Sequence, residues 1–254
     1  MTHDDTTGTE IAELVRVVAA LLSDDGGCDW NRGQTHGSLV TYLVEETAEL
    51  VEAIEEGTTA DRREELGDVL YQVVLHSALA ERQGAFDLAD VVRDVTAKTV
   101  RRHPHVFGDD EARDVDDIVR LWSAAKAHEK SERTSAFDGV PGGLPALARA
   151  QKIDGRRRAA GLPADEPPRA CEPGEEAAGS RSDGGSTGRP PVDDPTEGVA
   201  VDDELLLGRE LARMVDVATS RGIDAERALR RAVREREARL RAVETEGRAP
   251  HQPE

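Results

Sequence analysis

The sequence predicts an all-α fold, a bundle of helices joined by short loops. Apolar residues recur every three or four positions through most of the chain, as on the buried stripe of an amphipathic helix. β-branched residues follow the same spacing instead of the alternation typical of a strand. Loop signals rich in Gly, Pro and Asp separate these stretches. This combination indicates antiparallel helices packed around an aliphatic core.

Two helices are predicted before position 57. Residues 10–22 have one apolar face, and this run ends at the loop signal SDDGG. An irregular stretch, CDWNRGQTHGS, follows. A second helix is expected over 39–56, where it ends before Gly57, a residue suited to a helix C-terminus. Its inner face is expected to carry Leu39, Leu43, Val44, Val51 and Ile54.

Three more helices are predicted up to residue 130. Thr58 or Thr59 is the expected N-cap of a helix over 61–83. The next helix ends at Arg102, because the histidine that follows precedes a proline and so leaves the α region. Residues 114–130 then form a fifth amphipathic helix.

The remaining chain predicts a boundary, a linker and a second helical segment. Residues 1–162 are expected to form one domain, whose last short helix lies within 141–162. Residues 163–203 hold seven of the twelve prolines and no Leu, Ile, Phe, Met, Trp or Tyr, so they are predicted to be a disordered acidic linker. Two Arg-rich helices are expected over 204–246, and 247–254 form a disordered tail.

The last helical pair resembles an earlier part of the same chain. Residues 64–102 can be set beside 205–241, with Gly67 opposite Gly208 and the Gly84 turn opposite Gly222. The acidic positions are lost, because leucine and arginine stand where the first copy has Glu65 and Asp68. The second copy is therefore expected to be degenerate and structural. The alternative is that any two amphipathic helix pairs would align this well.

Composition limits the kinds of partner. The formal net charge is −19, and residues 163–204 alone hold three arginines against twelve acidic residues. Such a field repels polyanions, so binding to nucleic-acid polymers or to membranes is not expected. The two cysteines form no zinc or disulfide signature. No apolar run has the length of a membrane span, and a cytoplasmic location is expected.

Two acidic stretches, EETAE and EELGD, place carboxylates three residues apart on neighbouring helices. The pairs are Glu46 with Glu49, and Glu65 with Asp68. Residues i and i+3 share a helix face, so two antiparallel helices could direct four carboxylates to one point. The simpler alternative is a solvated acidic face. Because Asp68 interrupts an apolar run, and because no Glu-x-x-His motif is present, a hard cation such as Mg²⁺ or Mn²⁺ is the expected ligand.

Cationic and aromatic residues form two further candidate sets. Lys98 and Arg102 lie one turn apart and could hold phosphates, although cations also commonly complement a helix C-terminus. Trp122 and Lys126 are also one turn apart and could stack on a nucleobase or simply pack on the bundle. Trp30 and His36, in the irregular stretch, could cover a base or belong to a capped connection.

These motifs together resemble the MazG-type nucleoside triphosphate pyrophosphohydrolases. EETAE followed by EELGD is similar to the ExxE–ExxD signature of that family, and CDWNRGQTH is similar to its CPWDxxQTH. VRRHPHVFGD, LWSAAKAHEK and DGVPGGLPALARAQK are similar to later family segments. The resemblance covers 10–162 closely and 204–246 in degenerate form. Asp29 and Asn31 depart from the family pattern, which makes the role of that loop less secure.

The resemblance implies an all-α homodimer that uses Mg²⁺ to hydrolyse NTP or dNTP to the monophosphate and pyrophosphate, an activity that sanitises nucleotide pools. It assigns Glu46, Glu49, Glu65 and Asp68 to the metal, and Lys98 and Arg102 to the phosphates. Trp122 and Lys126 would face the nucleotide, and Glu45 or Glu49 would accept a proton from water. Narrower activities, on dUTP, dCTP or phosphoribosyl-ATP, remain open, as does a non-catalytic nucleotide-sensing scaffold.

Overall fold

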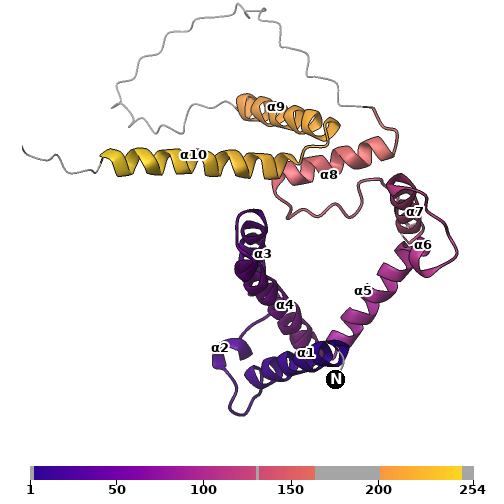
Figure 1. Ribbon diagram of the computed structural model, residues 1–254, viewed down its shortest axis with the longest axis vertical. Helices are drawn as coiled ribbons and strands as arrows, with labels where there is room; N and C mark the ends of the chain where they lie inside the picture. Colours follow the sequence, from indigo (N-terminus) through magenta and orange to yellow (C-terminus); the bar gives the residue numbers. More distant parts are fainter. Residues whose placement is uncertain (1–2, 130–131, 164–200, 248–254) are drawn as a thin grey trace, which may run out of the picture. The chain divides into compact units, whose positions relative to one another are not determined.

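The computed structural model describes residues 3–129, 132–163 and 201–247. All regular secondary structure in these ranges is helical (Figure 1), which confirms the predicted all-α class. None of the described helices combines the length and apolar character that a membrane crossing requires. The helices are α1 (His3–Leu21), α2 (Asp29–Arg32), α3 (Val40–Glu55), α4 (Thr59–Arg82), α5 (Leu88–Arg102), α6 (Pro104–Phe107), α7 (Val115–His128), α8 (Ala146–Ala159), α9 (Val201–Ser220) and α10 (Ala225–Gly247).

The chain divides into two compact units, Met1–Ser131 and Glu132–Glu254. The boundary expected after residue 162 therefore differs from the observed one. The reason is that α8 packs against α9 and α10. The predicted linker falls almost wholly in 164–200, and the predicted tail in 248–254, both outside the described residues.

The core of the first unit lies where α1 and α3 pack on α4. Its buried side chains come from α1, from α4, and from the residues just after α1 and just before α3. They are Val18, Leu22, Leu39, Val74, Leu75 and Leu79. The inner face expected for α3 was partly wrong, because Val44 and Ile54 are 63% and 58% exposed. Most of the packing of α3 is on α4, and one helix cannot bury all the apolar positions of another.

Local sequence signals fix the ends of the α3–α4 hairpin and of the turn that follows. Thr58 caps α4 by accepting a hydrogen bond from the Asp61 amide, and Asp61 accepts one from the Thr58 amide in return. Such a reciprocal capping box satisfies two amides that a helix start otherwise leaves unpaired. Gly84 ends the next turn with φ +68°, a conformation that favours glycine.

The α5 helix leaves the α3–α4 hairpin at an angle and packs on α7 instead (Figure 1). Asp87 caps it through a second reciprocal box with Asp90. The short α6 begins at Pro104, in agreement with the predicted break after Arg102. The first unit therefore has two arms, one formed by α3 and α4 and the other by α5 and α7.

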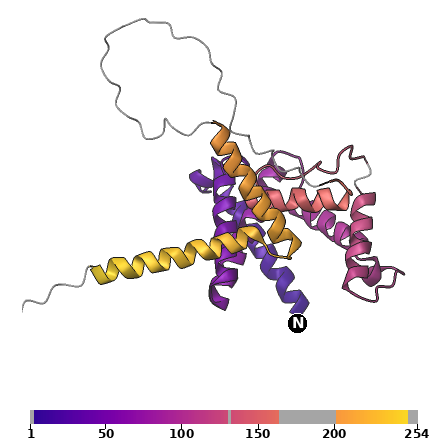
Figure 2. The ribbon, with the colours of Figure 1, turned by 90° about the horizontal axis from the view of Figure 1, so that it is seen from above.

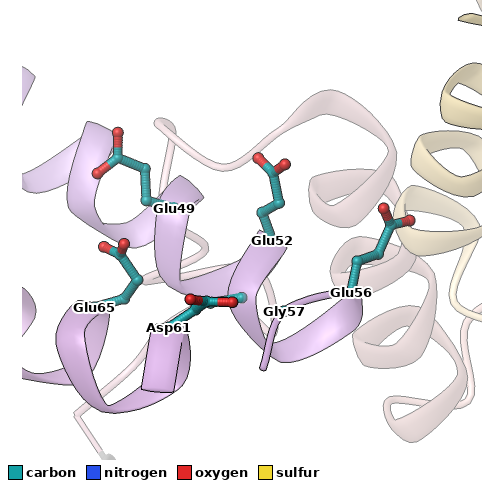
Figure 3. A pocket seen from close by; sticks show the side chains of 7 residues that line it. Glu49, Glu52, Glu56, Gly57, Asp61 and Glu65 are labelled. Atoms are coloured by element: carbon teal, nitrogen blue, oxygen red, sulfur yellow. The ribbon is translucent and has the colours of Figure 1, made fainter. Parts of the chain in front are cut away.

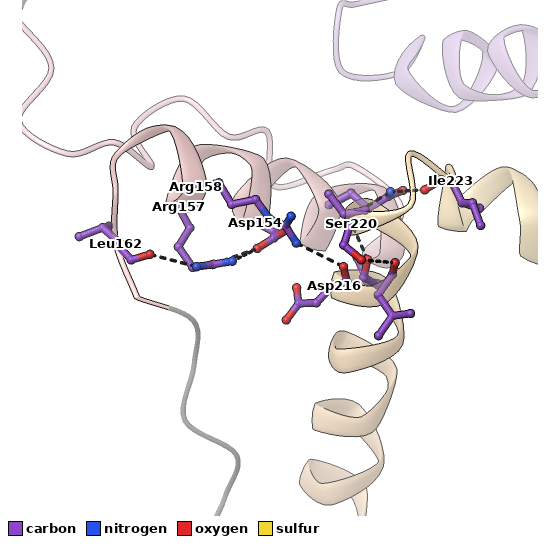
Figure 4. Close-up of polar contacts among 11 residues, drawn as sticks. Asp154, Arg157, Arg158, Leu162, Asp216, Ser220 and Ile223 are labelled. Atoms are coloured by element: carbon purple, nitrogen blue, oxygen red, sulfur yellow. Dashed lines mark hydrogen bonds and ion pairs between the residues drawn. The ribbon is translucent and has the colours of Figure 1, made fainter.

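The second unit is a three-helix assembly, in which Figure 2 shows α8 and α9 crossing. On α8, the buried carboxylate of Asp154 pairs with Arg157 and Arg158, and Arg158 reaches the Asp216 carbonyl of α9 (Figure 4). The turn from α9 to α10 contains Gly222 with φ +69°, close to the +68° of Gly84 between α4 and α5. In both turns the next amide bonds a carbonyl five residues back (Ala85 to Ala80, Ile223 to Ala218), so the two copies share this turn geometry.

Candidate metal centre

The α3–α4 hairpin brings three of the four predicted carboxylates together. Glu46, Glu49 and Glu65 each offer an oxygen, and these oxygens lie within 4.8 Å of one another. Asp68 follows one turn after Glu65 on the same face of α4, and its charge raises the pKa of both Glu46 and Glu65. The antiparallel packing of the two acidic helices therefore brings three of these four carboxylates close together.

Loss of hydration and repulsion between neighbouring carboxylates raise the pKa of two members of the cluster, Glu46 and Glu65. The pKa of Glu46 is raised by loss of hydration and then by the charges of Asp68 and Glu49. The pKa of Glu65 is raised by loss of hydration and by Glu49 and Asp68. One oxygen of Glu65, Oε2, is buried without a hydrogen-bond partner among the described residues. An oxygen-binding divalent cation would offset both the repulsion and the missing partner.

A pocket of about 380 Å³ opens beside this cluster. Figure 3 shows Glu49 and Glu65 next to one another at one end, with Glu52 and Glu56 further along α3. Asp61 also lines the pocket, but its carboxylate belongs to the α4 cap, which lowers its pKa. The donor atoms offered by the cluster are carboxylate oxygens, and these fit Mg²⁺ or Mn²⁺ better than a soft metal.

Sequence reasoning missed Gln72, which lies at the buried end of the acidic cluster. Its side chain is only 4% exposed, and its Oε1 atom has no hydrogen-bond partner among the described residues. A hydrogen bond from its amide acts on Glu46 and opposes the rise in that carboxyl's pKa. The signal was present in the sequence, because Gln72 is the one polar residue in YQVVL and stands four residues after Asp68.

The cationic and aromatic residues meet where α5 contacts α7. The Arg102 guanidinium lies 5.5 Å from the centre of the Trp122 ring, and the Lys126 ammonium lies 4.6 Å from it. Lys98 is exposed one turn before Arg102. Glu129, which sequence reasoning did not select, pairs with Arg102 at 2.6 Å. In Figure 1 these helices lie apart from α3, so the structure gathers two separate groups of predicted site residues.

The two predicted loop residues contact the α3–α4 hairpin. Trp30 meets the edge of Tyr42 on α3, with ring centres 5.6 Å apart, and remains 50% exposed. His36 stacks on His76 of α4, and their Nδ1 atoms are 2.8 Å apart. His76 thus joins the loop to the hairpin. Both loop residues lie on the arm that carries the acidic cluster.

Comparisons with known proteins identify relatives of the chain. Residues 34–107 match the model of the MazG nucleotide pyrophosphohydrolase domain. A nucleoside triphosphate pyrophosphohydrolase/pyrophosphatase MazG from Thermotoga maritima is 37% identical over 93% of this chain and 86% of its own length. An uncharacterized 26.1 kDa protein of Streptomyces cacaoi is 44% identical over 71% of this chain and 76% of its own. The Escherichia coli nucleoside triphosphate pyrophosphohydrolase is 38% identical, and the match spans 57% of that protein.

Proposed function

The chain belongs to the MazG family of nucleotide pyrophosphohydrolases, and we propose that it hydrolyses nucleoside triphosphates to the monophosphate and pyrophosphate with the help of Mg²⁺ or Mn²⁺. The observation that carries this proposal is the carboxylate cluster of Glu46, Glu49 and Glu65. A triphosphate is itself polyanionic, so a cluster of carboxylates can receive it only through cations that bind both.

Glu46, Glu49, Glu65 and Asp68 would hold the cation, which supplies charge neutralisation for the phosphates and lowers the pKa of a bound water. A carboxylate at the edge of the cluster, Glu45 or Glu49, would accept the proton of the attacking water. Proton transfer of this kind requires a carboxylate that is ionised, and the cation favours ionisation by offsetting the repulsion within the cluster.

Lys98 and Arg102 would bind the phosphate oxygens that the cation leaves uncovered. Arginine offers a planar fork to phosphate, and lysine a point charge. Trp122 and Lys126 would contact the nucleotide beside these phosphates. The Trp122 ring lies against the side chains of Arg102 and Lys126 on the α5–α7 arm. Trp30 and His36 would cover the nucleotide from the hairpin arm.

A homodimer would explain how the two arms serve one site. Apolar side chains on α4 are exposed in the first unit, with Leu66, Leu70 and Val73 at 57%, 41% and 38%, and Val92 and Val95 on α5 are also exposed. A contiguous apolar stripe beside a polar site is typical of a protein interface. A second copy packed on this stripe would bring its α5–α7 arm toward the acidic cluster of the first.

The test is a panel of NTPs and dNTPs with Mg²⁺, in which both products are identified. Wild-type protein is expected to release pyrophosphate and monophosphate, and Glu46→Gln or Asp68→Asn to lose at least about a hundredfold in rate, as when a charge-stabilising group is removed from an active site. Pyrophosphate release at the wild-type rate by both variants would show that the metal assignment is wrong.

A further inference from the structure

Gln72 occupies an unusual place for an uncharged side chain. Only 4% of its surface is exposed. It stands on α4, one turn beyond Asp68 and two turns beyond Glu65. Positions 65, 68 and 72 share one face of a helix, because seven residues are close to two turns. The amide therefore lies at the inner end of the acidic cluster, between the carboxylates and the apolar core.

Burying an amide is costly unless both of its ends are bonded. The side chain of Gln72 lies near enough to Glu46 to lower that carboxyl's pKa, against the larger rise from loss of hydration and from acidic neighbours. Its Oε1 atom is buried and has no partner among the described residues. A leucine at this position would fill the same space without that cost, and the neighbouring core residues Val74 and Leu75 show that the environment accepts aliphatic side chains.

We propose that Gln72 is a positioning residue for the cation site: its amide holds the Glu46 carboxylate toward Glu49 and Glu65, and its free oxygen accepts a hydrogen bond from a water of the bound cation. This inference rests on the proposed function, because it needs the carboxylate cluster to bind a divalent cation. It adds an uncharged residue to a site otherwise made of carboxylates.

The chemistry of the amide fits this role better than a charged group does. A lysine at the same position would donate to Glu46 but would also neutralise the cluster and compete with the cation. A glutamate would add another negative charge and could not donate. Glutamine donates without changing the net charge, so it can fix the direction of Glu46 and leave the cluster's full attraction for a cation. The planar amide also places Oε1 next to the group that Nε2 contacts.

Residues that orient metal ligands from the second layer typically change metal affinity tenfold to a hundredfold when they are removed. Gln72→Leu and Gln72→Met both remove the donor and the acceptor and replace the amide with an apolar side chain of similar volume. We expect both to bind Mg²⁺ and Mn²⁺ about 10–100-fold more weakly than wild type in calorimetric titrations of the metal-free protein. Thermal unfolding without metal is expected to change little, or to occur at a higher temperature.

Ser77→Ala is the matched control, because Ser77 is also a buried polar residue of α4, and among the described residues its hydroxyl donates to the Val73 carbonyl of its own helix. It should bind metal as wild type does. If Gln72→Leu and Gln72→Met keep wild-type metal affinity, the inference is wrong and Gln72 only fills the core. If wild type itself binds no divalent cation, the proposed function fails first, so the two failures can be told apart.

Discussion

The carboxylate of Glu129, just after α7, accepts two hydrogen bonds from the Arg102 guanidinium at the end of α5, with its Oε2 atom 3.0 Å from Nε and 2.6 Å from Nη2. Arg101 bonds the other oxygen at 3.3 Å. The guanidinium also lies on the Trp122 ring. These contacts hold Arg102 in one orientation through Nε and Nη2, while Nη1 is the nitrogen that a phosphate would meet.

Glu129→Gln is therefore expected to weaken substrate binding more than chemistry. The amide has one carbonyl oxygen in place of a delocalised carboxylate, so it holds Arg102 less firmly, at a cost of about 1–2 kcal/mol for a charge-assisted hydrogen bond. Steady-state kinetics should show KM for the triphosphate raised about tenfold and kcat changed less than threefold, on the scale of 1.4 kcal/mol for each factor of ten. Asp116→Asn, at the exposed start of α7, is the control, and equal kinetics of both variants would contradict the positioning of Arg102 by Glu129.

The same pair predicts a dependence of stability on pH. Arg102, followed by Arg101, lowers the pKa of Glu129 in the folded protein. Its contribution to stability is complete above the unfolded pKa of glutamate and is lost as pH falls through the lower folded value. The melting temperature of wild type should therefore fall across that acidic window relative to that of Glu129→Gln. Parallel pH profiles of the two proteins would exclude this contribution.

Much of this arrangement could be predicted from the sequence, and the missing parts have physical reasons. Helix positions follow from apolar periodicity, so the α3–α4 hairpin and its carboxylates were expected. The Thr58 cap was one of two candidates, because both threonines are good caps and only the backbone decides between them. Glu129 was missed because it acts on Arg102 through a contact between helices that spacing within one helix does not reveal. The spacing of Gln72 after Asp68 was visible in the sequence, but its interaction with Glu46 on the other helix was not. The boundary after 162 differed because α8 packs on α9 and α10, a contact between parts far apart in the sequence that the spacing within α8 does not reveal.

Glu46→Gln is expected to stabilise the metal-free protein while it removes cation binding. The pKa of Glu46 is raised in the folded state by loss of hydration and by its acidic neighbours. The ionised carboxylate therefore costs stability above the folded pKa, and this cost disappears as pH falls toward the unfolded value. At neutral pH without metal, the variant should melt about 2–4 °C above wild type, and the gain should shrink at acidic pH. Excess Mg²⁺ should raise the melting temperature of wild type only, whereas a Mg²⁺ shift of equal size in Glu46→Gln would argue against this carboxylate as a ligand.

Leu70→Asp tests the proposed dimer. Leu70 is 41% exposed in the middle of the α4 stripe, and a carboxylate there would be buried without a partner in a dimer but solvated in a monomer. Sedimentation or light scattering should show the variant as a monomer at concentrations where wild type is a dimer. Ile11→Asp, at a similarly exposed position on α1, is the control. A wild-type monomer, or an unchanged dimer of Leu70→Asp, would reject α4 as the interface.

Gln151→Leu separates the role of the second unit from the chemistry. Gln151 of α8 bonds the turn between α9 and α10 three times: its Nε2 donates to the Ile223 carbonyl at 2.8 Å and to the Thr219 hydroxyl at 3.3 Å, and its Oε1 accepts from the Ala225 amide at 2.8 Å. Leucine leaves these groups unpaired, so the second unit should lose about 2–3 kcal/mol of stability. Hydrogen exchange should quicken over 201–247, while kcat and Mg²⁺ affinity stay at wild-type values because the carboxylates lie in the first unit.

Lys152→Gln, on an exposed face of α8, is the control for a substitution on this helix that breaks none of these bonds. A fall in kcat in Gln151→Leu alone, at unchanged Mg²⁺ affinity, would show that the second copy takes part in turnover despite having leucine and arginine where the first copy has Glu65 and Asp68.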